Sequence, residues 1–378
     1  MNIPRHLKLS NLLEKKSFFL FGPRAVGKSY LIRETLPGSV VYNLLDPVLV
    51  RDLSRNPNLI EQRQDDWQKL IVIDEIQKLP GILDEVHRLI EEKSARFLLT
   101  GSSAKKLRSA GVNLLAGRAW EARLFPLIWR ELPNPDLDSF LLKGGMPSVV
   151  LSKDPWEELS AYTATYLEQE IRAEAYVKDL GQFVTFLDIV ATKIAEELNY
   201  QSIASDLGVS PPTVSNYFQL LEDTLLGFRL YPYSKTKKRK AVSRPKFYLF
   251  DLGISSALLN RRELPTKSDA YGKAFEHFIA LEITAYLSYA RRPEKLTYWR
   301  SQSGMEIDFV VGDSLAIEVK SSDSVPDRAL KGLKAFMEEG ICKRHILISK
   351  ERVRRKVGEI EILPWEIFLD MLWKGELF

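Results

Sequence analysis

The sequence predicts an α/β protein with a parallel sheet in its N-terminal third, a helical middle and a second α/β region at its C-terminal end. Three observations lead to this prediction. Short apolar runs alternate with helical segments over about the first 130 residues, and a glycine-rich turn directly follows the first run. Near the C-terminus, two short strands flank a Gly312-Asp313 turn. At 378 residues, the chain has room for two or three domains.

Composition and charge narrow the class of protein. No apolar run approaches the roughly 18 residues of a membrane span, and the N-terminal residues lack the apolar core of a signal peptide. Cys342 is the only cysteine, which excludes an intrachain disulfide and a cysteine-based zinc cluster. We therefore expect a cytoplasmic protein without a membrane segment. The net charge of +4 is modest, but residues 235–246 contain seven basic side chains and no acidic one.

The first element is the apolar run 17–21, which is typical of a strand buried on both faces of a parallel sheet. A Gly-x4-Gly-Lys-Ser pattern follows it directly, and residues 30–36 continue as a helix. This order lets backbone N–H groups and the positive end of a helix surround phosphates. The alternative is a chance glycine turn before a helix. The predicted nucleotide-binding residues are Gly22, Pro23, Arg24, Ala25, Val26, Gly27, Lys28, Ser29, Tyr30 and Asp74.

Four more runs complete the predicted sheet, at residues 39–45, 69–75, 96–102 and 120–127, with helices expected over 79–93 and 103–111. The strand predicted at 69–75 ends in two acids. Asp74 is expected to bind Mg²⁺ together with Ser29, and Glu75 to orient the water that hydrolyses ATP. The alternative for this pair is a set of surface acids after a strand.

Two further side chains are candidates for hydrolysis. Thr100 ends the next strand, where it would sense the γ-phosphate, although a hydroxyl there is also common in turns. Arg118 would stabilise developing charge on the phosphate of a neighbouring subunit. A surface salt bridge is the alternative for Arg118, and it is favoured for Arg123.

The segments GPRAVGKSYL, LIVIDEIQKLP, LLTGSSAKKL and LAGR…FPL together resemble the AAA-type ATPases of bacteria and archaea. Specifically, they resemble the subfamily that joins the ATPase to an uncharacterised C-terminal half. The resemblance implies a homo-oligomer, expected to be a ring, that binds ATP and Mg²⁺.

The middle of the chain is predicted to be helical, with a long amphipathic segment at 156–175. Residues 199–234 then have a helix-turn-helix pattern, with a turn at Gly208 and Ser210 as the cap of the second helix. The following strand and basic loop are interpreted as a wing. A module used only for protein packing, with a solvated basic loop, is the alternative. The predicted DNA contacts are Thr213, Ser215, Asn216, Lys237, Lys238, Arg239 and Lys240.

The last hundred residues contain a helix over 271–287 and the predicted hairpin strands EIDFVV and LAIEVK. Asp308 lies on the first strand, and Glu318 and Lys320 share one face of the second. Paired carboxylates beside a lysine suit metal-assisted cleavage of a phosphodiester, with the lysine positioning the water. A hairpin with solvent-facing acids is the alternative.

This pattern, with Glu276 on the preceding helix, resembles the PD-(D/E)XK nuclease superfamily. Ile307 stands where that superfamily has proline before the aspartate. The resemblance implies that Glu276, Asp308 and Glu318 bind Mg²⁺ and that Lys320 is catalytic. A nuclease fold kept only to hold DNA, or as a structural domain, remains open.

We therefore expect an oligomeric, Mg²⁺-dependent ATPase that acts on DNA. Branched DNA is suggested only by analogy with junction-resolving nucleases. The alternative is a signalling or chaperone-like ATPase whose C-terminal modules bind proteins. The predicted domains are a P-loop AAA-type core (1–132), a helical lid and connector (133–198), a winged helix-turn-helix (199–250) and a nuclease-like α/β domain (251–378).

Overall fold

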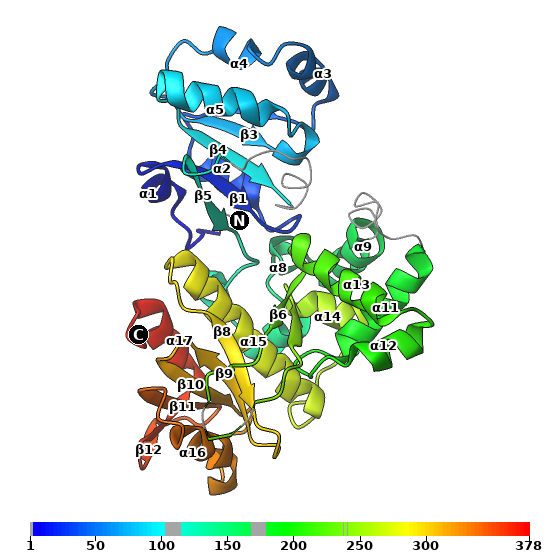
Figure 1. The fold of residues 1–378 in the computed structure, drawn as a ribbon, viewed down its shortest axis with the longest axis vertical. Coiled ribbons are helices and arrows are strands. Elements are labelled where there is room, and N and C mark those ends of the chain that lie inside the picture. The colour runs from blue at the N-terminus through cyan, green and yellow to red at the C-terminus, as the bar shows by residue number, and fades with distance from the viewer. Residues whose placement is uncertain (1–2, 103–114, 168–178, 237, 240) are drawn as a thin grey trace. The chain divides into compact units, whose positions relative to one another are not determined.

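The structure is a computed structural model that describes residues 3–102, 115–167, 179–236, 238–239 and 241–378. It divides into two compact units (Figure 1). The first contains Met1–Pro133 and Leu220–Leu226, and the second contains Asn134–Gln219 and Gly227–Phe378. None of the helices in these described ranges is long and apolar enough to cross a bilayer.

The N-terminal unit is built on a five-stranded sheet in the order β2-β3-β4-β1-β5, in which every neighbouring pair is parallel. This confirms the predicted parallel α/β fold. Its strands are β1 (Ser17–Phe21), β2 (Val40–Asn43), β3 (Ile71–Asp74), β4 (Phe97–Gly101) and β5 (Ala119–Arg123). Its helices are α1 (Leu9–Leu13), α2 (Lys28–Thr35), α3 (Pro47–Arg55), α4 (Leu59–Gln62) and α5 (Ile82–Lys93), with 3-10 turns at Ile76–Lys78 and Trp129–Glu131. The predicted helix at 103–111 lies outside the described residues.

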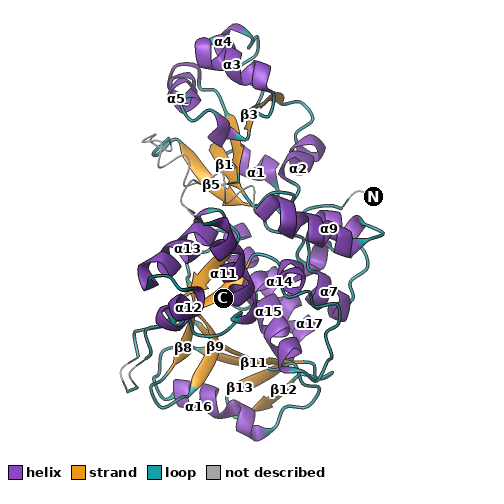
Figure 2. Ribbon diagram, turned by 90° about the vertical axis from the view of Figure 1, so that its right-hand side faces the viewer, coloured by secondary structure: helices purple, strands orange, loops and turns teal. Residues whose placement is uncertain are grey.

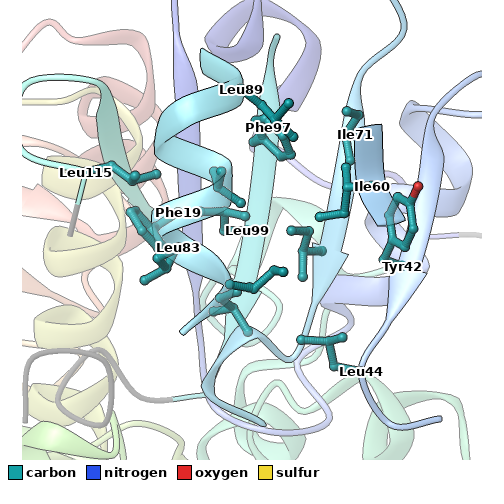
Figure 3. Packing of buried hydrophobic residues seen from close by; sticks show 14 of the residues in the cluster. Phe19, Tyr42, Leu44, Ile60, Ile71, Leu83, Leu89, Phe97, Leu99 and Leu115 are labelled. Carbon is teal, nitrogen blue, oxygen red and sulfur yellow. The ribbon is translucent and has the colours of Figure 1, made fainter. Parts of the chain in front are cut away.

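Both faces of this sheet are covered. Phe19, Ile73 and Leu99 point to one face and pack with Val86 and Leu89 of α5 in a single apolar cluster (Figure 3). The alternate strand residues are buried as well, and they include Phe18, Leu20, Val72 and Leu98. Burial on both faces explains why β1, β3 and β4 are almost entirely apolar.

The second unit begins with helices α7 (Leu137–Lys143), α8 (Pro147–Leu151), α9 (Pro155–Ala161) and α11 (Leu180–Thr192), with a π-helical segment at Tyr162–Leu167. Part of the amphipathic segment predicted at 156–175 lies outside the described residues. Helices α12 (Tyr200–Leu207) and α13 (Pro211–Asp223) then form a helix–turn–helix around Gly208. The antiparallel pair β6 (Gly227–Leu230) and β7 (Lys246–Leu249) follows, and then α14 (Leu252–Leu258).

The C-terminal sheet is mixed, with the strand order β12-β13-β11-β10-β9-β8. Its strands are β8 (Leu296–Arg300), β9 (Glu306–Val311), β10 (Leu315–Val319), β11 (Arg344–Ser349), β12 (Arg355–Val357) and β13 (Ile360–Pro364). Helices α15 (Asp269–Tyr289) and α17 (Trp365–Lys374) lie on one side, and α16 (Lys331–Met337) lies on the other (Figure 2). Strands β9 and β10 form the antiparallel hairpin that the sequence predicted, joined through Gly312 with a φ of 53°.

Candidate functional sites

The phosphate loop joins β1 to α2 in a conformation that requires glycine at two positions. Gly27 has a φ of 92°, in the left-handed region that favours glycine. A Cβ atom at Gly22 would lie 2.6 Å from the Leu124 carbonyl oxygen, closer than atoms can pack. Lys28 is the first residue of α2, and its Nζ donates hydrogen bonds to the carbonyl oxygens of Gly22 (2.7 Å) and Pro23 (3.0 Å). The loop therefore folds around the ammonium group that would face phosphate.

Three predicted residues from different parts of the N-terminal unit meet at the carboxyl edge of its sheet. The Ser29 hydroxyl donates a hydrogen bond of 2.9 Å to Oδ2 of Asp74. The Thr100 hydroxyl donates to Oδ1 of the same carboxylate and accepts a 3.1 Å hydrogen bond from the Glu75 backbone N–H. The two side chains that would bind Mg²⁺ thus already contact each other. A hydroxyl and a carboxylate are the oxygen donors that this ion prefers.

Glu75 follows β3 with a φ of 61°, an uncommon value for a residue with a side chain. The Gln77 amide nitrogen donates a hydrogen bond to Oε2 of Glu75 and another, of 3.3 Å, to the Ser102 hydroxyl. Our sequence analysis did not identify Gln77. The only signal was its position two residues after the acid pair, and no known spacing rule assigns a role to that position.

Arg5 is a second residue that the sequence analysis missed. Its guanidinium group is buried and donates to the carbonyl oxygens of Val26 (2.7 Å) and Phe125 (2.6 Å). It also donates from Nε to Oε2 of Glu131, at 3.0 Å. Arg5 therefore ties the phosphate loop to the chain that follows β5.

Arg118 lies just before β5, and its side chain is 37% exposed. Its Nε donates a 2.6 Å hydrogen bond to Oε1 of Glu91 on α5. This ion pair corresponds to the surface salt bridge considered as the alternative. Arg123, at the end of β5, is exposed. A role for Arg118 toward a neighbouring subunit stays a prediction.

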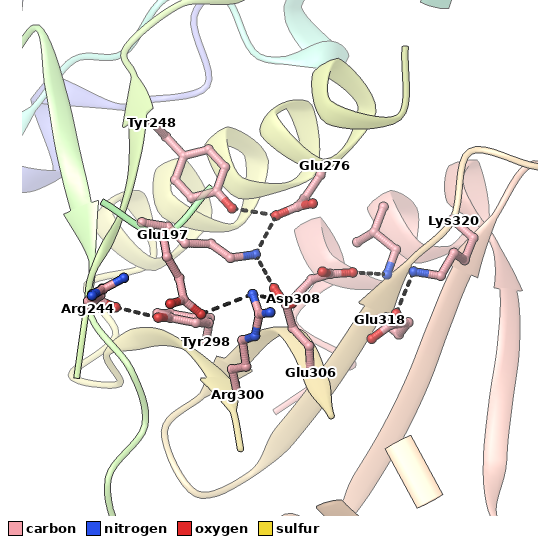
Figure 4. A network of polar contacts seen from close by, with 12 residues as sticks. Glu197, Arg244, Tyr248, Glu276, Tyr298, Arg300, Glu306, Asp308, Glu318 and Lys320 are labelled. Atoms are coloured by element: carbon pink, nitrogen blue, oxygen red, sulfur yellow. Dashed lines mark hydrogen bonds and ion pairs between the residues drawn. The ribbon is translucent and has the colours of Figure 1, made fainter. Parts of the chain in front are cut away.

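The predicted C-terminal residues come from three elements (Figure 4). Asp308 on β9 is buried, and its Oδ2 accepts a 2.7 Å hydrogen bond from the Val319 N–H. Glu318 on β10 is also buried, and its Oε1 accepts from Lys320 at 2.5 Å. Its other oxygen, Oε2, is buried without a hydrogen-bond partner. Glu276 projects from α15 toward the strand that carries Asp308.

Burial and mutual repulsion alter the acidity of these carboxyl groups. Burial and then the charge of Asp308 raise the pKa of Glu318 well above its usual value. Burial raises the pKa of Glu276 to about 7, although the nearby Lys246 opposes that change. Burial lowers the pKa of Lys320, but the charges of Asp308 and Glu318 outweigh this effect and leave it raised. Perturbed carboxyl groups beside a lysine are typical of a functional site.

Two residues on β7 complete this site, and the sequence analysis did not assign either to it. The Lys246 ammonium lies 3.2 Å from Oε1 of Glu276 and 2.7 Å from Oε1 of Glu306. The Tyr248 hydroxyl donates a 2.6 Å hydrogen bond to the same Glu276 oxygen. Among the described residues, no group of three or more His, Cys, Asp or Glu side chains is arranged to hold a metal ion. Lysine and tyrosine donors engage Oε1 of Glu276, and its role as a metal ligand stays a prediction.

A polar groove of about 830 Å³ opens beside this site. It reaches both Glu276 and Lys320, and the first turn of α15 forms part of its wall. Three more lysines line it: Lys267, Lys273 and Lys350. Four acids line it as well, Glu196, Asp269, Glu276 and Asp323, and Glu196 is paired with Lys273. Lysines in such a groove can contact the phosphates of a nucleic-acid backbone.

The helix–turn–helix surface presents some of its predicted contacts to solvent. Asn216 is exposed, whereas Thr213 and Ser215 are half-buried. In the basic loop, Arg239 donates 2.6 and 2.9 Å hydrogen bonds to Glu338 and to the Ala335 carbonyl oxygen. The predicted contacts Lys237 and Lys240 lie outside the described residues. The backbone N–H of Lys238 donates to Glu339 at 2.8 Å.

Three family models match consecutive parts of the chain. Residues 14–133 match a model described as an AAA domain. Residues 134–264 match a domain of unknown function, DUF8612, and residues 271–368 match another, DUF4143. The chain thus joins an AAA-type ATPase domain to a C-terminal DUF4143 domain, and the first match supports nucleotide hydrolysis. The resemblance of the N-terminal domain is confirmed, and the winged-helix and nuclease-like interpretations stay predictions.

Relatives that match most of this chain come from bacteria and archaea. An uncharacterized protein of Mycobacterium tuberculosis is 26% identical over 81% of this chain and 70% of that protein. One from Haemophilus influenzae is 27% identical over 83% of this chain and 81% of its own length. One from Methanocaldococcus jannaschii is 23% identical over 95% of this chain and 85% of its own length. A crystal structure of Pif1 helicase from Candida albicans is 14% identical over 43% of this chain and 48% of that chain. The TM-score of this match is 0.21.

Proposed function

We propose that this chain is a homo-oligomeric, Mg²⁺-dependent ATPase that acts on DNA, and that its C-terminal site binds and cleaves the phosphodiester backbone. The observation that carries the C-terminal half is the burial of the Asp308 and Glu318 carboxyl groups beside Lys320, which lines the adjoining polar groove. A structural hairpin does not require two buried carboxyl groups, because burying charge without compensation destabilises a fold.

In the N-terminal domain, each residue has a part in hydrolysis that follows from its contacts. Lys28 exchanges its hydrogen bonds with loop carbonyls for the β- and γ-phosphates of ATP. Ser29 and Asp74 would hold a Mg²⁺ ion, which would neutralise phosphate charge. Glu75 orients the attacking water. The Thr100 hydroxyl holds the Asp74 carboxylate and the Glu75 backbone in fixed positions relative to each other, because it is hydrogen-bonded to both.

In the C-terminal domain, Asp308 and Glu318 would hold a divalent ion through Asp308 and the unpartnered Oε2 of Glu318. Such an ion lowers the pKa of bound water and stabilises charge on the phosphate. Lys320 is held by Glu318, so its ammonium is fixed where it can orient that water. The groove lysines would contact the phosphates of a DNA strand and so position that DNA next to the Asp308–Glu318 site.

A second candidate function has its own observation. Lys235 is paired with Asp313 at 2.9 Å, and Arg239 is paired with Glu338. Pairing of these two basic side chains within their own domain favours a signalling or chaperone-like ATPase with protein-binding C-terminal modules. A DNA titration at two salt concentrations, with ATP turnover measured with and without DNA, separates the two functions. No salt-dependent binding and no stimulation by DNA would favour the second.

The decisive test of the C-terminal site is a cleavage assay. Labelled single-stranded, duplex and four-way-junction DNA are incubated with Mg²⁺ or Mn²⁺, with and without ATP. We expect nicking by the wild type, its loss in Asp308→Asn and Glu318→Gln, and normal ATP turnover without DNA in both variants. Asp313→Asn is the matched control, because this exposed acid lies at the turn of the same hairpin. Tight binding without cleavage by the wild type would indicate a nuclease fold that only holds DNA.

A further inference from the structure

Lys246 is a buried cation that contacts two carboxylates of the C-terminal site. Only 2% of this residue is accessible, and its ammonium group contacts Glu276 at 3.2 Å and Glu306 at 2.7 Å. The ring of Tyr298 lies 5.2 Å from Nζ. A buried ammonium is strongly destabilising unless carboxylates surround it, so this position is specific for a permanent positive charge.

The contacts of Glu276 separate it from the other acids of the site. Its Oε1 accepts hydrogen bonds from both Lys246 and the hydroxyl of Tyr248. Both donors stand on β7. One oxygen of Glu276 is thus held by two donors of the protein.

The situation of Glu318 is different. Its Oε2 is buried and has no hydrogen-bond partner, although its other oxygen is paired with Lys320. A buried carboxylate oxygen without a donor is costly and indicates a missing positive partner. Asp308 lies beside Glu318, because its Oδ2 accepts a 2.7 Å hydrogen bond from the N–H of Val319, the next residue along β10. One or two carboxylates with water molecules are a common coordination set for Mg²⁺.

The charges of the whole site fit one divalent ion. Five carboxylates stand in the site with three cationic side chains, which leaves two negative charges when all of them are ionised. The carboxylates belong to Glu197, Glu276, Glu306, Asp308 and Glu318, and the cations to Lys246, Arg300 and Lys320. Without Lys246, the site would have an excess of three negative charges. One divalent ion neutralises only two of them.

We propose that Lys246 is a built-in cation that takes the place of a second metal ion, so that the site binds a single divalent ion at Asp308 and Glu318 while Glu276 serves to hold Lys246. This inference rests on the metal site of the proposed function. It changes the role of Glu276 from a metal ligand to a positioning residue for the lysine, and it makes Lys246 part of the same site.

The test counts bound Mn²⁺ ions by electron paramagnetic resonance in the full-length protein at pH 8 without nucleotide. All proteins carry Asp74→Asn, so that the N-terminal site does not contribute. The parent protein is expected to bind one ion, which Asp308→Asn removes. Lys246→Met keeps the length of the side chain but removes its charge, and it is expected to bind a second ion. Adding Glu276→Gln to Lys246→Met should remove that second ion.

Three further variants make the test specific. Lys246→Arg keeps the positive charge and should bind one ion. Lys350→Met removes a charge from the groove, where Lys350 contacts Tyr271 rather than the carboxylates, and should also bind one ion. Glu276→Gln in the parent protein should retain its single ion, and this result does not depend on whether Lys246→Met folds.

The possible outcomes separate this inference from the proposed function. Loss of the ion in Glu276→Gln, or one ion of unchanged affinity in folded Lys246→Met, would overturn the role of Lys246. Absence of any Asp308-dependent ion in the parent protein would overturn the metal site itself. In that case, Lys246→Met could still gain an ion that the added Glu276→Gln removes, and this result would support Lys246 as the resident cation. If Lys246→Met gained no ion, both the metal site and the role of Lys246 would be rejected.

Discussion

The hydroxyl of Ser29 donates a 2.9 Å hydrogen bond to Oδ2 of Asp74, although 45 residues separate them in the chain. Parallel pairing explains this contact, because the loop after β1 and the end of β3 reach the same edge of the sheet. The side chains proposed to hold Mg²⁺ therefore already contact each other at this edge. Ser29→Ala should weaken Mg²⁺-dependent ATP binding while leaving Mg²⁺-independent binding close to that of the wild type, as a fluorescent-nucleotide titration with and without Mg²⁺ would reveal.

Two variants separate ATP binding from hydrolysis. Lys28→Ala removes the cation fixed against the phosphates, so we expect loss of detectable ATP binding. Glu75→Gln should bind ATP normally but turn it over at least about a hundredfold more slowly, because only activation of water is lost. Binding by titration and phosphate release give the two readouts, with exposed Lys15→Ala as the control. Equal ATP affinity in Lys28→Ala and wild type would reject the phosphate-loop assignment.

Arg5 is expected to be essential to the stability of the N-terminal domain. Arg5→Met leaves the Glu131 carboxylate buried and unpaired, which costs about 3–5 kcal/mol. Arg5→Met combined with Glu131→Met should unfold less readily than the sum of the single variants implies, because no isolated charge remains. Calorimetry of the transition assigned to this domain measures the effect. Additive losses would show that the two side chains are not energetically coupled.

Subunit exchange tests the role of Arg118. If it acts on a neighbour, Arg118→Ala mixed with Lys28→Ala should recover part of the ATPase activity, because each supplies what the other lacks. Glu91→Ala breaks the same ion pair but keeps the arginine, so it should remain active alone. A co-assembled mixture as inactive as its components would leave Arg118 as a surface ion pair.

Metal binding at the C-terminal site should depend on pH in a defined direction. The pKa of Glu276 is about 7, and that of Glu318 is raised, so the folded protein holds protons that the unfolded chain releases above about 4.5. Without metal, the free energy of unfolding should fall as pH rises from that value toward 7. Divalent ions require ionised Glu318, so Mn²⁺ affinity should increase with pH, by up to about tenfold per unit for each proton released. Calorimetry in buffers of different ionisation enthalpy counts those protons.

Salt dependence distinguishes two paths for DNA. Lys267→Ala and Lys350→Ala in the groove should each reduce the slope of log K against log salt by up to about 0.9 on duplex. Replacing Lys238 and Arg239 should change the slope less, because Arg239 is already paired with Glu338. A larger effect from the basic loop would favour the winged-helix interpretation over the groove.

The elements closest to a regular pattern were the easiest to predict. The five N-terminal strands follow from short apolar runs, and the β9–β10 hairpin follows from its Gly312-Asp313 turn. Their order in the sheet was not predicted, because apolar periodicity identifies strands but does not specify which of them pair.

Side chains that act through distant partners were not predictable. Arg5 meets Glu131 across 126 residues, and nothing near Arg5 in the sequence distinguishes it from a surface arginine. Lys246 was counted only as one basic residue in a charged stretch. Its burial depends on β7 lying beside the first turns of α15, a packing that local sequence does not encode.

The border between two family models falls inside the C-terminal site. Lys246 and Tyr248 belong to the segment 134–264, whereas Glu276 and Glu306 belong to 271–368. A recombination event that exchanged only one of the two segments would separate the buried Lys246 ammonium from the carboxylates of Glu276 and Glu306. The protein would then contain a buried charge without its partner. The two segments should consequently be inherited as a single unit, and replacements at Lys246 should be accompanied by replacements at Glu276 or Glu306. Lineages in which these positions change independently would contradict that expectation.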